Sequence, residues 1–112
     1  MSRRDLQAIG DVSQLVLDHR LAALREAASQ LERSRAQLAA INAAAAPADL
    51  PPVAAGLVDV SYQRWADTRR TDLNTVMAQQ TVALIDARGE ASTAFGRLQA
   101  LRGLAERLGR RR

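Results

Sequence analysis

The sequence predicts an all-α protein, a two-helix antiparallel coiled-coil hairpin with a longer C-terminal helix. Three observations support this prediction. The 112 residues include 23 alanines and 16 arginines, with no lysine, and both residue types lose little side-chain freedom in a helix. Prolines interrupt the chain in one place, between two long segments. Within each segment, apolar residues recur in alternating steps of four and three, which is the heptad pattern of a coiled coil.

The first helix is expected over residues 3–45. Ser2 and Asp5 have the spacing of a capping box, which places the start of the helix near Arg3. The seam, the line of residues that faces the partner helix, follows the alternating steps with Arg35 as its one misfit: Leu17, Leu21, Leu24, Ala28, Leu31 and Leu38. At 1.5 Å per residue this helix is about 60 Å long.

A proline-rich turn is expected over residues 46–55, because prolines cannot continue a helix. The second helix is expected over residues 56–108, about 75 Å at the same rise per residue. Three residues near its start are possible N-caps: Asp49, Asp59 and Ser61. Its seam includes Arg70 and Gln80 as polar members and otherwise consists of Ala66, Leu73, Met77, Leu84, Ala87, Ala91, Ala94, Leu98, Leu101, Ala105 and Leu108. The short linker favours an antiparallel pair.

The excess positive charge is confined to the C-terminal end. Residues 1–96 hold 10 arginines against 11 acidic residues, whereas residues 97–112 hold 6 arginines against Glu106 alone. Because the second helix is longer, we expect its arginine tail, residues 109–112, to project beyond the first helix. The tail has three interpretations: a solvated helix end favoured by the macrodipole, a contact with a protein acceptor, or a site for nucleic acid or an anionic membrane. No basic stripe runs along either helix, which disfavours nucleic acid.

Other surface features carry two interpretations each. Tyr62, Trp65 and Arg69 either cover the turn or form a binding hot spot. An apolar band on the first helix is either buried by a local shift of the seam or exposed as an interface: Leu6, Ile9, Val12, Leu15 and Val16. Glycines spaced by seven on the outward face of the second helix either are tolerated or admit another helix beside Phe95: Gly89, Gly96 and Gly103.

Catalytic and metal-binding chemistry find no support in the sequence. There is no cysteine, and His19 is the only histidine, so we expect no metal site, no cofactor and no enzymatic activity. Charges interrupt every apolar segment, so no membrane span is expected, and the protein would be peripheral to a membrane at most. A chain without cysteine fits a cytoplasmic location.

Two segments resemble the FliJ-type (YscO-like) stalk proteins of the flagellar and virulence type III export apparatus. In "YQRWADTRRTDLNTVMAQQTVALIDARGEASTAFGRLQALRGLAERL", residues 62–108, the likeness lies in aromatic residues near the turn, heptad-spaced Leu, Gln and Ala, and arginine-flanked leucines. In "LDHRLAALREAASQLERSRAQLAAI", residues 17–41, it lies in repeated leucine and alanine beside Arg–Glu pairs. The proline-rich turn stands where the family has a longer tip.

The resemblance implies a coiled-coil stalk that inserts into the ring of the export ATPase, promotes its assembly and activity, and contacts the export gate and substrate chaperones. It further implies that the C-terminal arginines contact the ATPase: Arg97, Arg102, Arg107, Arg110, Arg111 and Arg112. Tyr62 and Trp65 would then contact the gate or a chaperone. Two alternatives stay open, a general coiled-coil adaptor that forms a homodimer or four-helix bundle, and a small nucleic-acid-binding protein.

Overall fold

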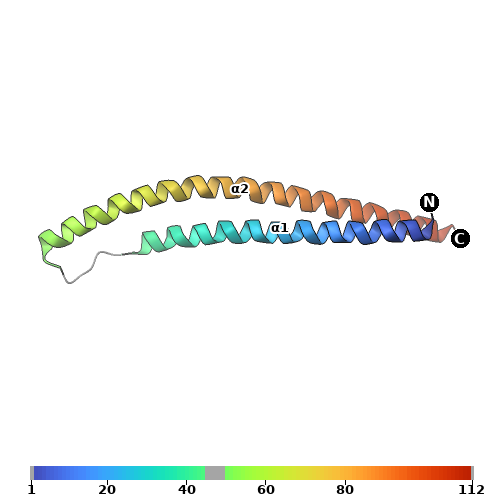
Figure 1. Ribbon diagram of the computed structural model, residues 1–112, viewed down its shortest axis with the longest axis horizontal. Helices are drawn as coiled ribbons and strands as arrows, with labels where there is room; N and C mark the ends of the chain where they lie inside the picture. Colours follow the sequence, from blue (N-terminus) through green and yellow to red (C-terminus); the bar gives the residue numbers. More distant parts are fainter. Residues whose placement is uncertain (1, 45–49, 112) are drawn as a thin grey trace. The chain divides into compact units, whose positions relative to one another are not determined.

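The computed structural model describes residues 2–44 and 50–111, which form two helices. Helix α1 spans Arg3–Ala43 and helix α2 spans Pro52–Arg110 (Figure 1). No strand occurs among these residues. The predicted fold class, an all-α hairpin with a longer C-terminal helix, is confirmed.

The capping box at the start of α1 is present. The backbone N–H of Asp5 donates to the Ser2 hydroxyl at 3.1 Å, and the Ser2 N–H approaches the Asp5 carboxylate at 3.4 Å. The backbone N–H groups at the start of a helix have no partner within the helix, and these two bonds supply partners for two of them. Helix α1 therefore begins at Arg3. It ends at Ala43, two residues before the expected end.

Helix α2 begins four residues earlier than expected, at Pro52. Proline suits the first helical position, because its fixed φ matches the helix and its missing N–H has no partner there anyway. Asp59 and Ser61 therefore lie inside the helix and do not cap it, and Asp49 lies outside the described residues. The helix continues through Gly109 to Arg110, so the basic tail is helical up to that residue.

The chain divides into two units, each a pair of antiparallel helical segments. In the open-end unit, described residues 2–28 and 82–111, Leu17, Ala94 and Leu98 form the core and Leu21 packs against it. The salt bridge Arg20–Glu90, 2.9 Å long and exposed, also links the two segments. Exposed ion pairs contribute little stability, so the apolar contacts hold this unit together.

In the turn-end unit, described residues 29–44 and 50–81, Ile41, Ala66 and Leu73 form a buried cluster, and Leu31 is also buried. Leu38 and Tyr62 pack against this core. Two polar contacts join the segments at its edge: Arg69 donates to the Gln37 amide oxygen at 3.1 Å, and Arg70 donates to that of Asn42 at 2.9 Å.

The seam on α2 follows the predicted positions, of which all but Ala105 are buried or half-buried. The seam on α1 differs from the prediction at alternate positions. Ala28 and Arg35 are exposed, whereas Ala27 is half-buried and Ser34 is buried. The leucines common to both lines, from Leu17 to Leu38, are buried or half-buried as expected. The charged side chain of Arg35 stays off the seam, because the position that faces α2 holds the small, uncharged Ser34.

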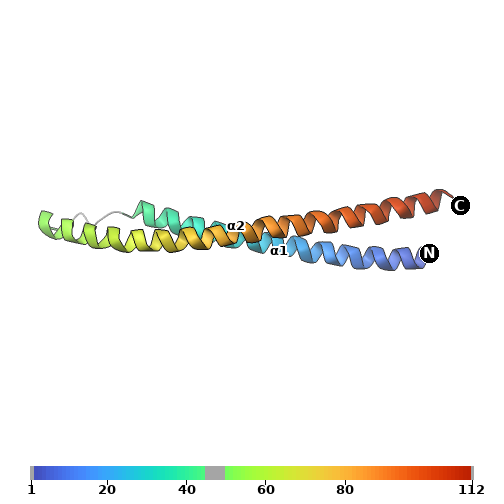
Figure 2. The same cartoon turned by 90° about the horizontal axis from the view of Figure 1, so that it is seen from above.

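The extra length of α2 lies at the turn, and the expectation of a projecting arginine tail is wrong. In the turn-end unit, the Tyr62 hydroxyl reaches the carbonyl of Ile41 near the end of α1, so residues 52–61 extend past that end (Figures 1 and 2). In the open-end unit, Leu17 packs with Leu98 and Gln14 bonds Arg102, so this antiparallel register places the first turn of α1 opposite the last turn of α2. The physical reason is that side-chain contacts fix the pairing register, and helix length does not.

Candidate protein-binding site

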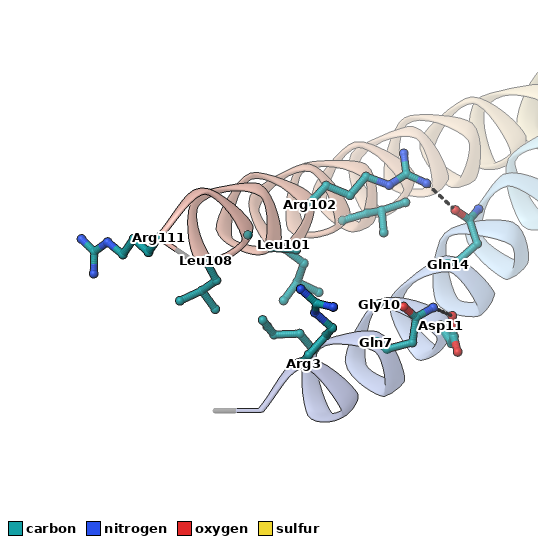
Figure 3. A pocket seen from close by; sticks show the side chains of 13 residues that line it. Arg3, Gln7, Gly10, Asp11, Gln14, Leu101, Arg102, Leu108 and Arg111 are labelled. Carbon is teal, nitrogen blue, oxygen red and sulfur yellow. Dashed lines mark hydrogen bonds between the residues drawn. The ribbon is translucent and has the colours of Figure 1, made fainter.

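The open-end unit contains a cleft between the first turns of α1 and the last turns of α2 (Figure 3). Its volume is about 670 Å³, within the range of about 300–1,000 Å³ that is usual for ligand pockets. Both helices line it: Arg3, Leu6, Gln7, Gly10, Asp11 and Gln14 from α1, and Leu98, Leu101, Arg102, Ala105, Leu108, Gly109 and Arg111 from α2 and the residue after it. Hereafter it is the open-end cleft.

The floor of the open-end cleft is the seam of α2. Leu98 is buried, Leu101 and Leu108 are half-buried, and both half-buried leucines point from α2 toward α1 in Figure 3. On α1 the same alternation, continued backward from Leu17, passes through Gly10 and ends at Arg3. A coiled coil needs an apolar side chain at such positions, and these two supply none.

Gly10 shows how much room this leaves. A Cβ atom built at Gly10 would meet no heavy atom of a neighbouring side chain or helix within 4 Å. The position therefore faces open space where a coiled coil normally places a packed side chain. We attribute the cleft to this absent side chain together with the charged Arg3, because a desolvated guanidinium cannot take the place of a leucine.

The rim of the cleft is positively charged. It carries Arg3, Arg102 and Arg111 against the single acid Asp11. Within residues 2–44 and 50–111, no ion pair involves Arg3 or Arg111. Arg102 donates to the amide oxygen of Gln14 at 3.2 Å. Such a rim, which faces an apolar floor, can hold a group that is apolar on one side and anionic on the other.

The structure brings only some of the sequence-predicted arginines to this cleft. Arg102 and Arg111 line it, and Arg112 lies outside the described residues. Three others are exposed and do not line it: Arg97, Arg107 and Arg110. Arg107 contacts the carbonyl of Gly103 in its own helix at 3.4 Å.

The predicted aromatic cluster separates into structural and exposed members. Tyr62 donates its hydroxyl to the Ile41 carbonyl at 2.7 Å, and Arg69 bonds Gln37, so both hold α1 to α2. Trp65 lies 5.7 Å from the Tyr62 ring, centroid to centroid, and is 54% exposed. Trp65 alone among the three therefore presents a large apolar surface to a partner.

The apolar band at the start of α1 is mostly exposed. Leu6 is buried on the seam, as a local shift of the seam predicted, but the other four members are exposed: Ile9, Val12, Leu15 and Val16. On α2, Phe95 is 50% exposed beside the glycine positions, all of which face open space. These residues form separate apolar surfaces outside the open-end cleft.

Sequence reasoning missed Arg3 and Gly10 as members of the site, and it considered Leu6 only as part of the apolar band. The signal was available, since heptad steps of four and three lead backward from Leu17 to Gly10, Leu6 and Arg3. It pointed to a site only once the pairing register of the two helices was known.

The described residues contain no group of three or more His, Cys, Asp or Glu side chains that could hold a metal ion. Over the same residues, neither helix contains a stretch apolar and uncharged enough to cross a membrane. Comparison with known proteins finds no match to a family model, a curated protein or a solved structure. The likeness to the export stalk proteins thus stays a prediction.

Proposed function

We propose that this chain is a non-enzymatic coiled-coil protein of an export apparatus, and that its open end binds the ring of the export ATPase. The observation that carries the proposal is the open-end cleft, where an apolar floor and three arginines meet at one end of the hairpin. Interfaces are richest in binding energy where apolar and arginine side chains combine. The resemblance to FliJ-type stalk proteins supplies the identity of the partner.

In this proposal, Arg3, Arg102 and Arg111 contact acidic loops of the ATPase, and Leu101 and Leu108 pack against apolar side chains between those loops. Trp65 is the candidate contact for an export gate protein or a chaperone, because it is the exposed member of its cluster. The arginines set specificity and the rate of encounter, and the leucines supply most of the burial energy.

The test is to mix the chain with a candidate export ATPase and to measure complex formation and ATP turnover. We expect a complex and faster turnover for the native chain. A double charge reversal, Arg3→Glu with Arg111→Glu, should abolish both effects. Arg64→Glu, at an exposed arginine of the turn-end unit, is the matched control and should leave them unchanged. Absence of both complex and stimulation with the native chain refutes the proposal.

A second candidate function, self-association as a structural adaptor, is favoured by the exposed apolar residues of α1. Val12 and Leu15 are 59% and 68% exposed, and Val16 on the same helix is also exposed; apolar side chains that gather on a surface mark interaction sites. Light scattering distinguishes the two candidates. A dimer or tetramer at micromolar concentration, dissociated by Val12→Ser with Leu15→Ser, supports self-association, and a monomer contradicts it.

A further inference from the structure

We infer that the open-end cleft receives the apolar face of an acidic amphipathic helix from a partner protein, so that a third helix completes the seam. The inference rests on the proposed function and specifies the chemistry of the partner. Its first support is the pattern of the floor. Leu98, Leu101 and Leu108 lie on one line of α2 at heptad spacing, and side chains of another helix fit such a line.

The second support is the space opposite that line. Gly10 offers no side chain, and a Cβ atom there would meet nothing within 4 Å. Ala105, the one exposed seam position of α2, also lines the cleft. Apolar side chains at positions i, i+3 or i+4, and i+7 of a partner helix would occupy this space and cover Leu101 and Leu108.

The third support is charge. The cleft presents three arginines and one acid, so flanking carboxylates on the partner helix would find guanidinium groups on both sides of the cleft. Arg102 now donates to the neutral amide of Gln14, and a hydrogen bond to a carboxylate is roughly twice as strong. A partner acid near Arg102 can therefore displace Gln14.

The same charge argument disfavours the other occupants. A second copy of this chain would have to offer an exposed apolar segment of its own: residues 8–16 or 52–61, each with a single acid, or residues 82–95, whose two acids accompany an arginine. A nucleic acid would use the arginines, but its phosphates gain nothing from a floor of leucines. An acidic helix uses both the floor and the rim.

Two labelled helical peptides of about four turns test the inference by fluorescence anisotropy with the full chain. Both carry leucines at i, i+3, i+4 and i+7, and they differ only in flanking glutamates or flanking lysines. We expect the glutamate peptide to bind and the lysine peptide to bind at least about tenfold more weakly, because of repulsion by the rim. Equal binding of the two peptides overturns the inference.

Gly10→Leu is the decisive variant, because it fills the cleft with a side chain of this chain. Binding of the glutamate peptide should fall by about tenfold or more, while far-UV circular dichroism shows an intact hairpin. Gly89→Leu is the matched control on the outward face of α2, where a Cβ atom also meets nothing within 4 Å. Unchanged binding by Gly10→Leu, or an equal loss in Gly89→Leu, places the peptide elsewhere and overturns the inference.

Arg3→Ala provides a second test that does not depend on packing. It should weaken the glutamate peptide severalfold and leave the lysine peptide no weaker than before. Vesicles with anionic headgroups and a DNA duplex are tested in parallel. If either binds with the same sensitivity to Gly10→Leu and the glutamate peptide does not bind, the occupant is a lipid or a nucleic acid and the inference is wrong.

The two proposals fail in different ways. If the chain stimulates the ATPase but binds neither peptide, the helix-in-cleft inference fails and the proposed function stands. If the glutamate peptide binds in a manner sensitive to Gly10→Leu but no export ATPase is bound, the cleft recognises an acidic helix of another protein and the proposed function fails.

Discussion

Gln80 gives the sharpest test of the packing. It lies on the seam of α2 between Met77 and Leu84, and its amide oxygen is buried with no hydrogen-bond partner among the described residues. It lines a small cleft of about 300 Å³ in the turn-end unit, together with Ser34 and Arg69. A buried polar group without a partner costs about 1–3 kcal/mol. Gln80→Leu should therefore stabilise the protein.

The expected gain in the free energy of unfolding is about 2 kcal/mol, since the side-chain volume hardly changes and the buried acceptor is removed. For a domain of this size that corresponds to a Tm increase of roughly 5–15 °C. Urea unfolding followed by far-UV circular dichroism measures the effect. Gln79→Leu, at the adjacent exposed position, is the control and should change stability by less than about 0.5 kcal/mol.

The reasoning fails if Gln80→Leu is no more stable than Gln79→Leu. That outcome would mean that the amide oxygen finds a partner in solution and that the seam tolerates it without cost. Polar residues on a coiled-coil seam also fix the pairing register at the expense of stability. We therefore expect Gln80→Leu to be more stable but to pair its helices in more than one register, and light scattering would detect this as additional oligomeric species.

Three further substitutions test other parts of the structure by the same unfolding assay. Leu98→Ala should cost about 2–5 kcal/mol of stability, because Leu98 is 3% exposed in a core cluster. Leu104→Ala, at a 38% exposed position, should cost less than about 1 kcal/mol, and equal losses in the two variants would contradict the assigned seam. Gly89→Ala should stabilise by up to about 1 kcal/mol because its new Cβ meets open space, and a loss would show that the position is covered by another chain. Tyr62→Phe should cost about 0.5–1.5 kcal/mol of stability, because it removes the hydrogen bond from the hydroxyl to the end of α1. Trp65→Ala should cost less, and the reverse order would mean that Trp65, and not Tyr62, holds the two helices together.

The start of α1 and the α2 seam could be predicted because local chemistry determines them. The capping box of Ser2 and Asp5 works within one turn, whereas the start of α2 was expected four residues too late, because a proline at position 52 suits a first helical turn. Along α2, Leu73 and Leu98 belong to a single unbroken heptad line, so only one stripe can face the partner.

The α1 seam could not be predicted fully, because two lines share its leucines. Between Leu31 and Leu38, either Ser34 or Arg35 completes the heptad spacing, and the same choice arises earlier between Ala27 and Ala28. Periodicity does not distinguish these neighbours. The burial of Ser34 shows that the small side chain is selected, since it lets α2 approach and keeps the guanidinium in water.

The sequence also could not predict which end of α2 extends past α1. Whether residues 52–61 extend past α1, or the arginine tail does, depends on the register between helices, and a shift by one heptad preserves every leucine contact type. Specific contacts decide the matter, among them the Tyr62 bond to Ile41 and the Arg102 bond to Gln14. These are tertiary contacts, so no local pattern in either helix predicts them.

The weak packing at the open end and the recognition proposed for it have the same cause. Arg3 and Gly10 occupy seam positions that an isolated, maximally stable hairpin would give to leucine. Replacing Gly10 by Leu should therefore stabilise the free protein and weaken its binding to an acidic helix, two effects of opposite sign from one substitution. If Gly10 affects only the packing of the hairpin, Gly10→Leu will stabilise the free protein without weakening the binding of the acidic helix. If the arginines alone bind the partner, Gly10→Leu will not weaken binding, and binding will not depend on Leu101 and Leu108. The pair of measurements thus separates a completed three-helix seam from both simpler interpretations.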